Sequence, residues 1–175
     1  RDLHRGDRRQ RQMCIRDSAN PKIMYASMWE VYPGVSGKNS GVYRSKNGGK
    51  TWTPCVDGLP SGALVGRIGL TVSHTNPLKA YAFVDNLNNP EGQTAELYKT
   101  IDGGVTWSKT NTQPFFIFSV IGWYFTDVYV NPKNDEEVYC LGIRLAHSID
   151  GGKTFSFIGG QVNRVMPSAA KGFHL

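Results

Sequence analysis

The stretch Thr100–Trp107, with the sequence TIDGGVTW, occurs in closely similar form at two other places in the chain. The copy SKNGGKTW covers residues 45–52, and the copy SIDGGKTF covers residues 148–155. All three share the order hydroxyl residue, any residue, Asp or Asn, Gly, Gly, any residue, Thr, aromatic residue. Their first residues lie 55 and 48 positions apart (100 − 45 and 148 − 100), which indicates an array of structural repeats.

Each copy has the features of a tight turn between two strands. Asp-Gly or Asn-Gly between alternating runs predicts a β-hairpin, and the side-chain oxygen of Asp or Asn can accept hydrogen bonds from backbone N–H groups of the turn. Catalysis or calcium binding is the alternative role for the carboxylate, but a catalytic residue has no reason to recur once per repeat. We assign this structural role to Ser45, Asn47, Gly48, Gly49, Thr51, Trp52, Thr100, Asp102, Gly103, Gly104, Thr106, Trp107, Ser148, Asp150, Gly151, Gly152, Thr154 and Phe155.

These turns resemble the Asp-box, or BNR repeat, and residues 19–175 are most similar to bacterial sortilin-like and glycosyl-hydrolase-like BNR repeat proteins. Asp-boxes occur in the β-propellers of sialidases, xyloglucanase-type glycoside hydrolases and sortilin-type receptors, between the outer strands of each blade and away from the active site. The resemblance implies a secreted or periplasmic protein of bacterial, metagenomic origin. Asn47 departs from the usual Asp but retains an acceptor oxygen.

A second recurring unit, Asn-Pro followed by an apolar run with Tyr, begins at Asn20, Asn76 and Asn131. Together with the Asp-box hairpin it gives four strands per repeat, which is the pattern of a propeller blade. We therefore expect an all-β fragment of a β-propeller, with four-stranded antiparallel blades and Asp-box hairpins between the outer strands. The expected units are a partial blade at 19–58, blades at 59–112 and 113–158, and the start of a further blade at 159–175. Open blade edges predict poor solubility or self-association.

Residues 1–18 form a basic stretch that does not fit the repeat pattern. Met13–Ser18 corresponds to a translated transposase adapter of the kind used to prepare sequencing libraries, and the preceding residues fit the same reading frame. We interpret residues 1–18 as adapter-derived, expect them to be disordered, and exclude them from the fold. They hold six Arg and three Asp and therefore contribute +3 to the net charge of +6. The rest of the chain carries only +3, so the case for a nucleic-acid partner is weak.

The remaining composition agrees with a turn-rich β domain, with 20 Gly and 9 Pro in the chain. Cys55 and Cys140 fall in different repeats without the spacing of a metal site, so we expect two unpaired thiols and not a disulfide. No apolar run reaches the length of a membrane span. We expect neither a cofactor nor a metal ion.

Candidate ligand contacts lie in the longer connections between strands. Trp29 and Glu30 fall in the first connection of this kind, and Asp85 begins the second, which covers residues 85–94. Asp127 begins an innermost strand, where a turn cap is the simpler role. The aromatic connection over residues 111–125 suits either sugar stacking or packing between blades, and we favour packing.

The catalytic residues of an enzyme are not identifiable from this pattern. A glycosidase needs two carboxyl groups roughly 5–9.5 Å apart, and no spacing rule selects such a pair here. A sialidase needs an arginine cluster, but Arg44 and Arg144 are expected near the Asp-box turns, away from an active site. The favoured hypothesis is a binding or interaction scaffold of the sortilin-like type. Its expected partners are a protein, peptide or glycan ligand at the propeller face and further blades of the same chain. The alternative is part of a xyloglucanase-like glycoside hydrolase.

Overall fold

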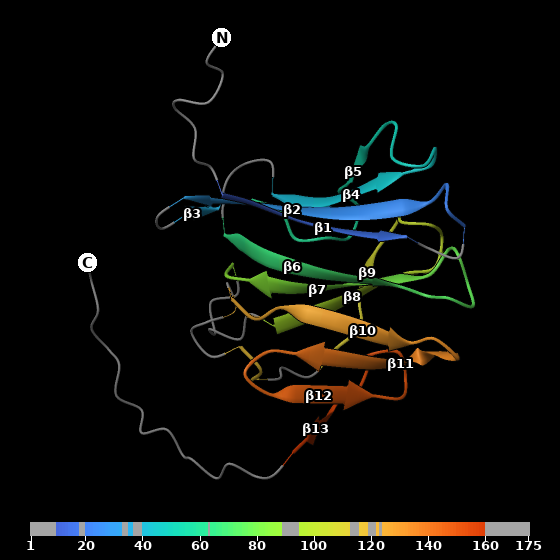
Figure 1. Ribbon diagram of the computed structural model, residues 1–175. Coiled ribbons are helices and arrows are strands. Elements are labelled where there is room, and N and C mark those ends of the chain that lie inside the picture. Colours follow the sequence, from blue (N-terminus) through green and yellow to red (C-terminus); the bar gives the residue numbers. More distant parts are fainter. Residues whose placement is uncertain are drawn as a thin grey trace.

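The computed structural model describes residues 10–17, 20–32, 35–36, 40–62, 64–88, 95–112, 116–118, 122 and 124–159. The described residues form thirteen strands in three antiparallel sheets (Figure 1). In this part of the chain no helix is present that could cross a lipid bilayer. The all-β class and the four-stranded antiparallel blades predicted from the repeats are confirmed.

The three sheets share one up-and-down strand order, in which each strand pairs with the next. The first sheet contains β1 (Gln10–Asp17), β2 (Met24–Tyr32), β4 (Gly41–Ser45) and β5 (Thr53–Cys55), and the short β3 (Val35–Ser36) pairs with β2. The second contains β6 (Val65–Val72), β7 (Ala80–Asn86), β8 (Ala95–Thr100) and β9 (Ser108–Lys109). The third contains β10 (Asp127–Asn131), β11 (Asn134–Leu141), β12 (Leu145–Ser148) and β13 (Ser156–Ile158).

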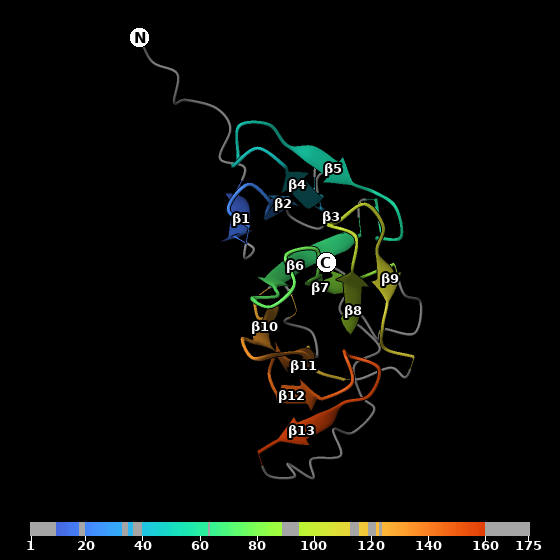
Figure 2. The same ribbon diagram turned by 90° about the vertical axis from the view of Figure 1, so that its right-hand side faces the viewer.

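The sheets stack face to face, with the first strand of each sheet on the same side of the stack. Figure 2 shows β1, β6 and β10 along one side, and β6 contacts both β1 and β10. One apolar core lies between the first and second sheets and includes Tyr25, Leu70 and Trp107. A second core lies between the second and third sheets and includes Phe83 and Val138. This arrangement is that of consecutive propeller blades, whose inner strands line the central axis.

The first sheet differs from the expectation that residues 1–18 are disordered. Residues 10–17 form β1, which runs antiparallel to β2 with Gln10 opposite Val31 and Asp17 opposite Met24. Without β1, the inner edge of β2 would expose a row of unpaired N–H and C=O groups. Main-chain pairing satisfies these groups and does not require the alternating side-chain pattern on which the sequence analysis relied.

Trp29 and Glu30 lie in a strand and not in the loop that was expected there. β2 continues to Tyr32, and its end pairs with β3 through Val31↔Ser36 and Tyr32↔Val35. A small hairpin therefore replaces part of the predicted connection. Asp85 likewise lies inside β7, opposite Ala95. The remainder of that connection, residues 89–94, lies outside the described residues.

The two thiols are unpaired, as predicted. Cys55 and Cys140 are both buried free cysteines. Cys55 lies in the core between the first and second sheets, and Cys140 lies in the core between the second and third sheets. Burial raises the pKa of the Cys140 thiol far above its usual range, so this side chain remains a neutral, apolar packing group.

Candidate binding rim

The Asp-box turns all lie on one rim of the stack, which we call the Asp-box rim and which is on the right in Figure 1. In the second turn, Asp102 accepts hydrogen bonds from Thr106 N, at 3.0 and 3.1 Å, and from the Thr106 hydroxyl at 2.7 Å. It also accepts from Val105 N at 2.9 Å and from the Thr100 hydroxyl at 2.8 Å. The carboxylate is therefore occupied by its own turn.

The other two turns repeat this network. Asp150 accepts from the Thr154 hydroxyl at 2.6 Å and from the Ser148 hydroxyl at 2.7 Å. Burial opposes its charged form, but the hydrogen bonds lower the pKa of Asp150 to about 2. In the first turn Asn47 accepts from Thr51 N at 2.9 Å, while its amide donates to the Thr51 hydroxyl at 2.8 Å. Asn47 thus preserves the turn, except that the Thr51 hydroxyl accepts from it, whereas the corresponding Thr hydroxyl donates to the Asp in the other two turns.

The opposite rim, on the left in Figure 1, holds the other ends of the strands. It includes the end of β2, the starts of β6 and β10, the end of β7, and the turn between β11 and β12. The four residues proposed from sequence as ligand contacts come from these elements. The structure thus brings Trp29, Glu30, Asp85 and Asp127 to the same rim, away from the Asp-boxes.

These four residues differ in how much surface they present. Trp29 is 8% exposed, so its indole offers little area to a ligand. The side chain of Glu30 lies outside the described residues. Asp85 is 4% exposed and lies against the backbone of Gly66 and Gly122, where a Cβ would overlap its carboxylate. Of the three side chains that the structure describes, that of Asp127 is the most exposed, with 47% of it accessible.

The accessible part of this rim is built around an ion pair. Arg67 Nη2 lies 3.5 Å from Asp127 Oδ1, and Arg67 Nη1 donates to the carbonyl oxygen of Tyr124. Tyr124 is 58% exposed and Phe125 41% exposed, and their rings meet edge to face with centroids 4.7 Å apart. The arginine thus connects β6 to the segment before β10. The aromatic connection and Asp127 are candidates from the sequence, whereas their common partner Arg67 becomes visible only in the structure.

A second carboxylate near this rim is fully engaged inside the second sheet. Glu96 is 5% exposed and accepts hydrogen bonds from Lys109 Nζ at 2.6 Å, Asn86 Nδ2 at 2.6 Å and the Tyr98 hydroxyl at 2.8 Å. Burial opposes the charged form, but these donors lower the pKa of the Glu96 carboxyl group. Glu96 therefore stays ionised at neutral pH. The sequence gives no sign of this network, because Glu96 is an ordinary polar residue of a strand and its donors Asn86 and Lys109 come from other strands.

Arg144 was expected near an Asp-box turn, and this prediction is wrong. It lies on the rim opposite the Asp-boxes. It precedes β12 in the turn that follows β11, so the whole of β12 separates it from the Asp-box at Ser148. Its guanidinium lies over the ring of Phe157, 5.1 Å from the centroid. Arg44, in contrast, is on the Asp-box rim as expected, where Nη1 donates to the carbonyl oxygen of Gly103 at 3.1 Å.

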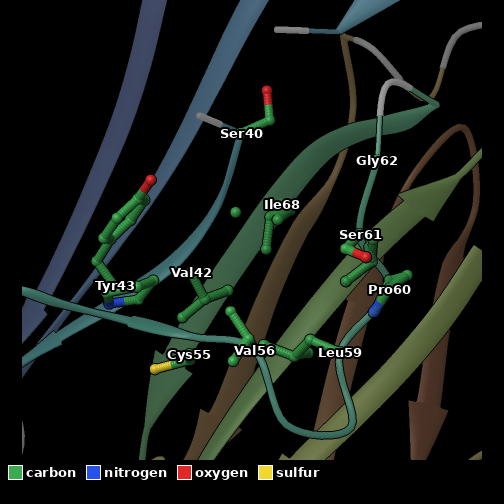
Figure 3. Close-up of a pocket in the computed structure, with 13 residues that line it drawn as sticks. Ser40, Val42, Tyr43, Cys55, Val56, Leu59, Pro60, Ser61, Gly62 and Ile68 are labelled. Atoms are coloured by element: carbon green, nitrogen blue, oxygen red, sulfur yellow. The ribbon is translucent and has the colours of Figure 1, made fainter. Parts of the chain in front are cut away.

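A pocket of about 160 Å³ lies between the first and second sheets (Figure 3). Its wall is formed in part by Val42 and Tyr43 of β4, Leu59 of the loop between β5 and β6, Ile68 of β6 and Val84 of β7. Small-molecule sites commonly measure about 300–1,000 Å³. This pocket is smaller and mainly apolar, so we base no ligand site on it.

Comparison with known proteins agrees with this architecture. The family model for the BNR/Asp-box repeat matches residues 43–54. No curated protein matches the sequence. Among solved structures, YCF48 bound to D1 peptide is similar with a TM-score of 0.54 and 13% identity, over 86% of this chain and 40% of that chain. The GH74 xyloglucanase from Xanthomonas campestris is similar with a TM-score of 0.57 and 17% identity, over 84% of this chain and 22% of that chain.

The GH74 enzyme from Niastella koreensis gives a TM-score of 0.51 at 17% identity, over 78% of this chain and 20% of that chain. At these identities the likeness shows the fold and not the activity. The chain spans less than half the length of each of these three structures. It consists of BNR-type β-propeller blades, and the resemblance read from its three Asp-boxes is confirmed.

Proposed function

We propose that the chain is a binding scaffold that holds a peptide segment on the rim opposite the Asp-boxes. The observation that carries this proposal is the exposed aromatic pair Tyr124 and Phe125 beside the Arg67–Asp127 ion pair. Aromatic residues and arginine are enriched in protein interfaces, where rings supply contact area and guanidinium groups supply directed hydrogen bonds. An apolar side chain of the peptide packs on the rings, and peptide carbonyl groups reach Arg67.

The similarity to YCF48 bound to D1 peptide agrees with this proposal, because that propeller is described with a peptide ligand. The alternative is a glycoside hydrolase, as in the GH74 structures. Such an enzyme needs a general acid whose pKa is raised. Glu96, one of the buried carboxylates near this rim, has its pKa lowered instead, and Asp127 is paired with Arg67. These two carboxylates suit fixed structural roles better than proton donation.

The test begins with selection of binders from a random peptide phage library on the immobilised chain. A selected peptide, labelled with a fluorophore, is then titrated by anisotropy against Tyr124→Ala and Phe125→Ala. We expect each substitution to weaken binding at least about tenfold, as is usual when a central interface aromatic is truncated. Ile101→Ala is the control, because Ile101 is 66% exposed and lies in the second Asp-box turn, on the other rim.

Equal loss of binding in the control and the rim variants would show that the rim is not the site. Xyloglucan oligosaccharide is incubated with the same samples and followed by release of reducing ends. Hydrolysis that disappears with Asp127→Asn but not with Ile101→Ala would favour the hydrolase instead. Circular dichroism melts confirm that each variant is folded.

A further inference from the structure

Each Asp-box turn is tied to its own sheet by one recurring backbone hydrogen bond. Its first glycine donates to a carbonyl of the hairpin between the first two strands: Gly48 to Lys22, Gly103 to Leu78 and Gly151 to Glu136. Lys22, Leu78 and Glu136 therefore occupy equivalent places, which we call the leading position. The next residues along the chain, Ile23, Lys79 and Glu137, are likewise equivalent, and we call their place the receiving position.

At the junction of the first and second sheets, the second Asp-box packs on the first sheet. Arg44 donates to the carbonyl oxygen of Gly103 at 3.1 Å. A Cβ on Gly104 would lie 2.7 Å from Cε1 of Tyr25, which is fully buried. The leading and receiving positions at this junction are both apolar, Leu78 and Ile23.

The junction of the second and third sheets has the same geometry but uses charges. The leading residue Glu136 and its neighbour Asp135 face two lysines of the second sheet. Lys79 Nζ lies 2.8 Å from Asp135 Oδ1 and also contacts Glu136, while Lys99 Nζ lies 3.7 Å from Glu136 Oε2. Tyr81, opposite Lys99 in the sheet, donates to the carbonyl oxygen of Asp135 at 2.7 Å. An acidic edge thus docks on a basic face.

The third sheet carries the same kind of receiving face with its charge reversed. Glu137 stands at the place of Lys79, and the cross-strand pair Tyr139 and His147 stands at the place of Tyr81 and Lys99. Glu137 accepts from Tyr139 at 2.6 Å and from Asn131 at 2.6 Å, and lies 3.0 Å from His147 Nε2. These hydrogen bonds lower the pKa of its carboxyl group, so the face remains acidic.

Among the described residues, the tyrosine and the receiving residue of this acidic face are more exposed than those of the second sheet, where the side chain of Lys79 is 5% exposed. Tyr25 and Tyr81 are both 0% exposed, whereas Tyr139 is only partly buried. The side chain of Glu137 is 21% exposed and that of His147 23% exposed. At the other two junctions, such a face is covered by the glycine turn of the next Asp-box. By analogy, this face would be covered by a further Asp-box turn, and its acidic charge calls for a basic residue at the leading position of that turn.

The first sheet supplies such an edge. Its leading residue, Lys22, is exposed, and two further exposed lysines, Lys46 and Lys50, lie in its Asp-box turn. Gly48 of that turn is exposed as well, whereas the glycines of the second and third Asp-boxes are buried under the preceding sheet. The two ends of the stack are therefore complementary in charge, and both lack a cover among the described residues.

We propose that two copies of this chain associate head to tail, with the acidic receiving face of the third sheet of each copy against the Lys22 edge of the first sheet of the other. The resulting pair has two identical junctions and twofold symmetry. It brings together six of the sheets that the structure describes, three from each copy, and closed propellers contain about four to eight blades.

The experiment measures molar mass by size-exclusion chromatography with light scattering over a range of concentrations. The wild-type chain is expected to change from 19.4 kDa to twice this mass as its concentration rises. Lys22→Glu and Glu137→Lys each place like charges at both junctions, and each is expected to raise the dissociation constant at least about tenfold. Lys133→Glu, an exposed lysine in the turn before β11, is the matched control and leaves the constant unchanged within about threefold.

The charge swap keeps the test independent of folding defects. The double variant Lys22→Glu/Glu137→Lys restores the pair, and so does an equimolar mixture of the two single variants, because each junction of the mixed pair joins one lysine with one glutamate. A wild-type chain that stays at 19.4 kDa, or a double variant no better than either single one, overturns the proposal. A mass that keeps growing beyond two copies overturns the closed pair.

Discussion

The second glycine of each Asp-box offers a controlled test of how the blades are joined. Gly49 and Gly104 have nearly the same backbone, with φ of 83° and 79°, so substitution by alanine strains both in the same way. Their surroundings differ. A Cβ on Gly49 would meet Met24 Sδ at 3.5 Å, an ordinary contact, whereas a Cβ on Gly104 would meet Tyr25 Cε1 of the neighbouring sheet at 2.7 Å. Gly104→Ala should therefore destabilise the chain more than Gly49→Ala.

The expected difference follows from two separate contributions. An L-residue with a left-handed backbone costs about 1–2 kcal/mol, which applies to both variants. Insertion of a methyl group into a closely packed site adds about 1–3 kcal/mol, which applies only at Gly104 because Tyr25 is fully buried in the core. The free energy of unfolding should thus fall by about 1–2 kcal/mol in Gly49→Ala and by about 2–5 kcal/mol in Gly104→Ala.

Urea denaturation followed by tryptophan fluorescence measures both values. The measurements are made in the Glu137→Lys background, so that association of copies does not cover Gly49. Tyr25→Leu removes the ring edge that the new methyl group meets, and in that background the extra cost of Gly104→Ala should shrink by at least about 1 kcal/mol. Equal losses for the two alanine variants, or no coupling to Tyr25, would refute the packing of the second Asp-box on the first sheet.

Two further predictions concern charged groups. Hydrogen bonds lower the folded-state pKa of Asp150 from its usual 3.8 to about 2. The stabilisation that its carboxylate gives is therefore present above about pH 4 and is lost as the pH falls towards 2. Urea titrations between pH 2 and 5 should show that the free energy of unfolding depends less on pH in Asp150→Asn than in the wild type. Lys79→Ala removes the cation that lies between Asp135 and Glu136 at the second junction, and it should lower the free energy of unfolding by about 2 kcal/mol. This is below the 3–5 kcal/mol of a fully buried pair, because those carboxylates are 22% and 45% exposed. Lys99→Ala, whose Nζ lies 3.7 Å from Glu136, is the comparison and should cost about 0.5 kcal/mol.

The sequence predicted those parts of the fold that depend on neighbouring residues. The Asp-box is one of them, because the hydrogen bonds of the Asp102 side chain join residues at most four positions apart, such as Thr106 to Asp102. The order of strands and the position of each turn followed from this motif. Strand β1 was missed, because its pairing with β2 uses main-chain groups that no side-chain pattern reveals.

The candidate binding rim was predictable only in part. Asp127 and the aromatic connection were recognised, but their common partner Arg67 comes from a different repeat, 60 positions before Asp127 (127 − 67), and no local signal connects them. Trp29 was expected on a loop, yet it lies in β2 with little exposed surface. Both differences arise from contacts between segments far apart in the chain, which composition and periodicity do not encode.

The junctions between sheets show why near-identical turns do not make the repeats interchangeable. The third repeat has three additional residues between its Asn-Pro unit and its Tyr (139 − 131 = 8, against 81 − 76 = 5 in the second), and the lengthened hairpin carries Asp135 and Glu136. These acids fit the lysines of the second sheet but would be repelled by Glu137 of a third sheet. The glycine turn therefore fixes the spacing between sheets, while the charges at the leading and receiving positions decide which sheet can follow which. A stack held by the turns alone would have no such order.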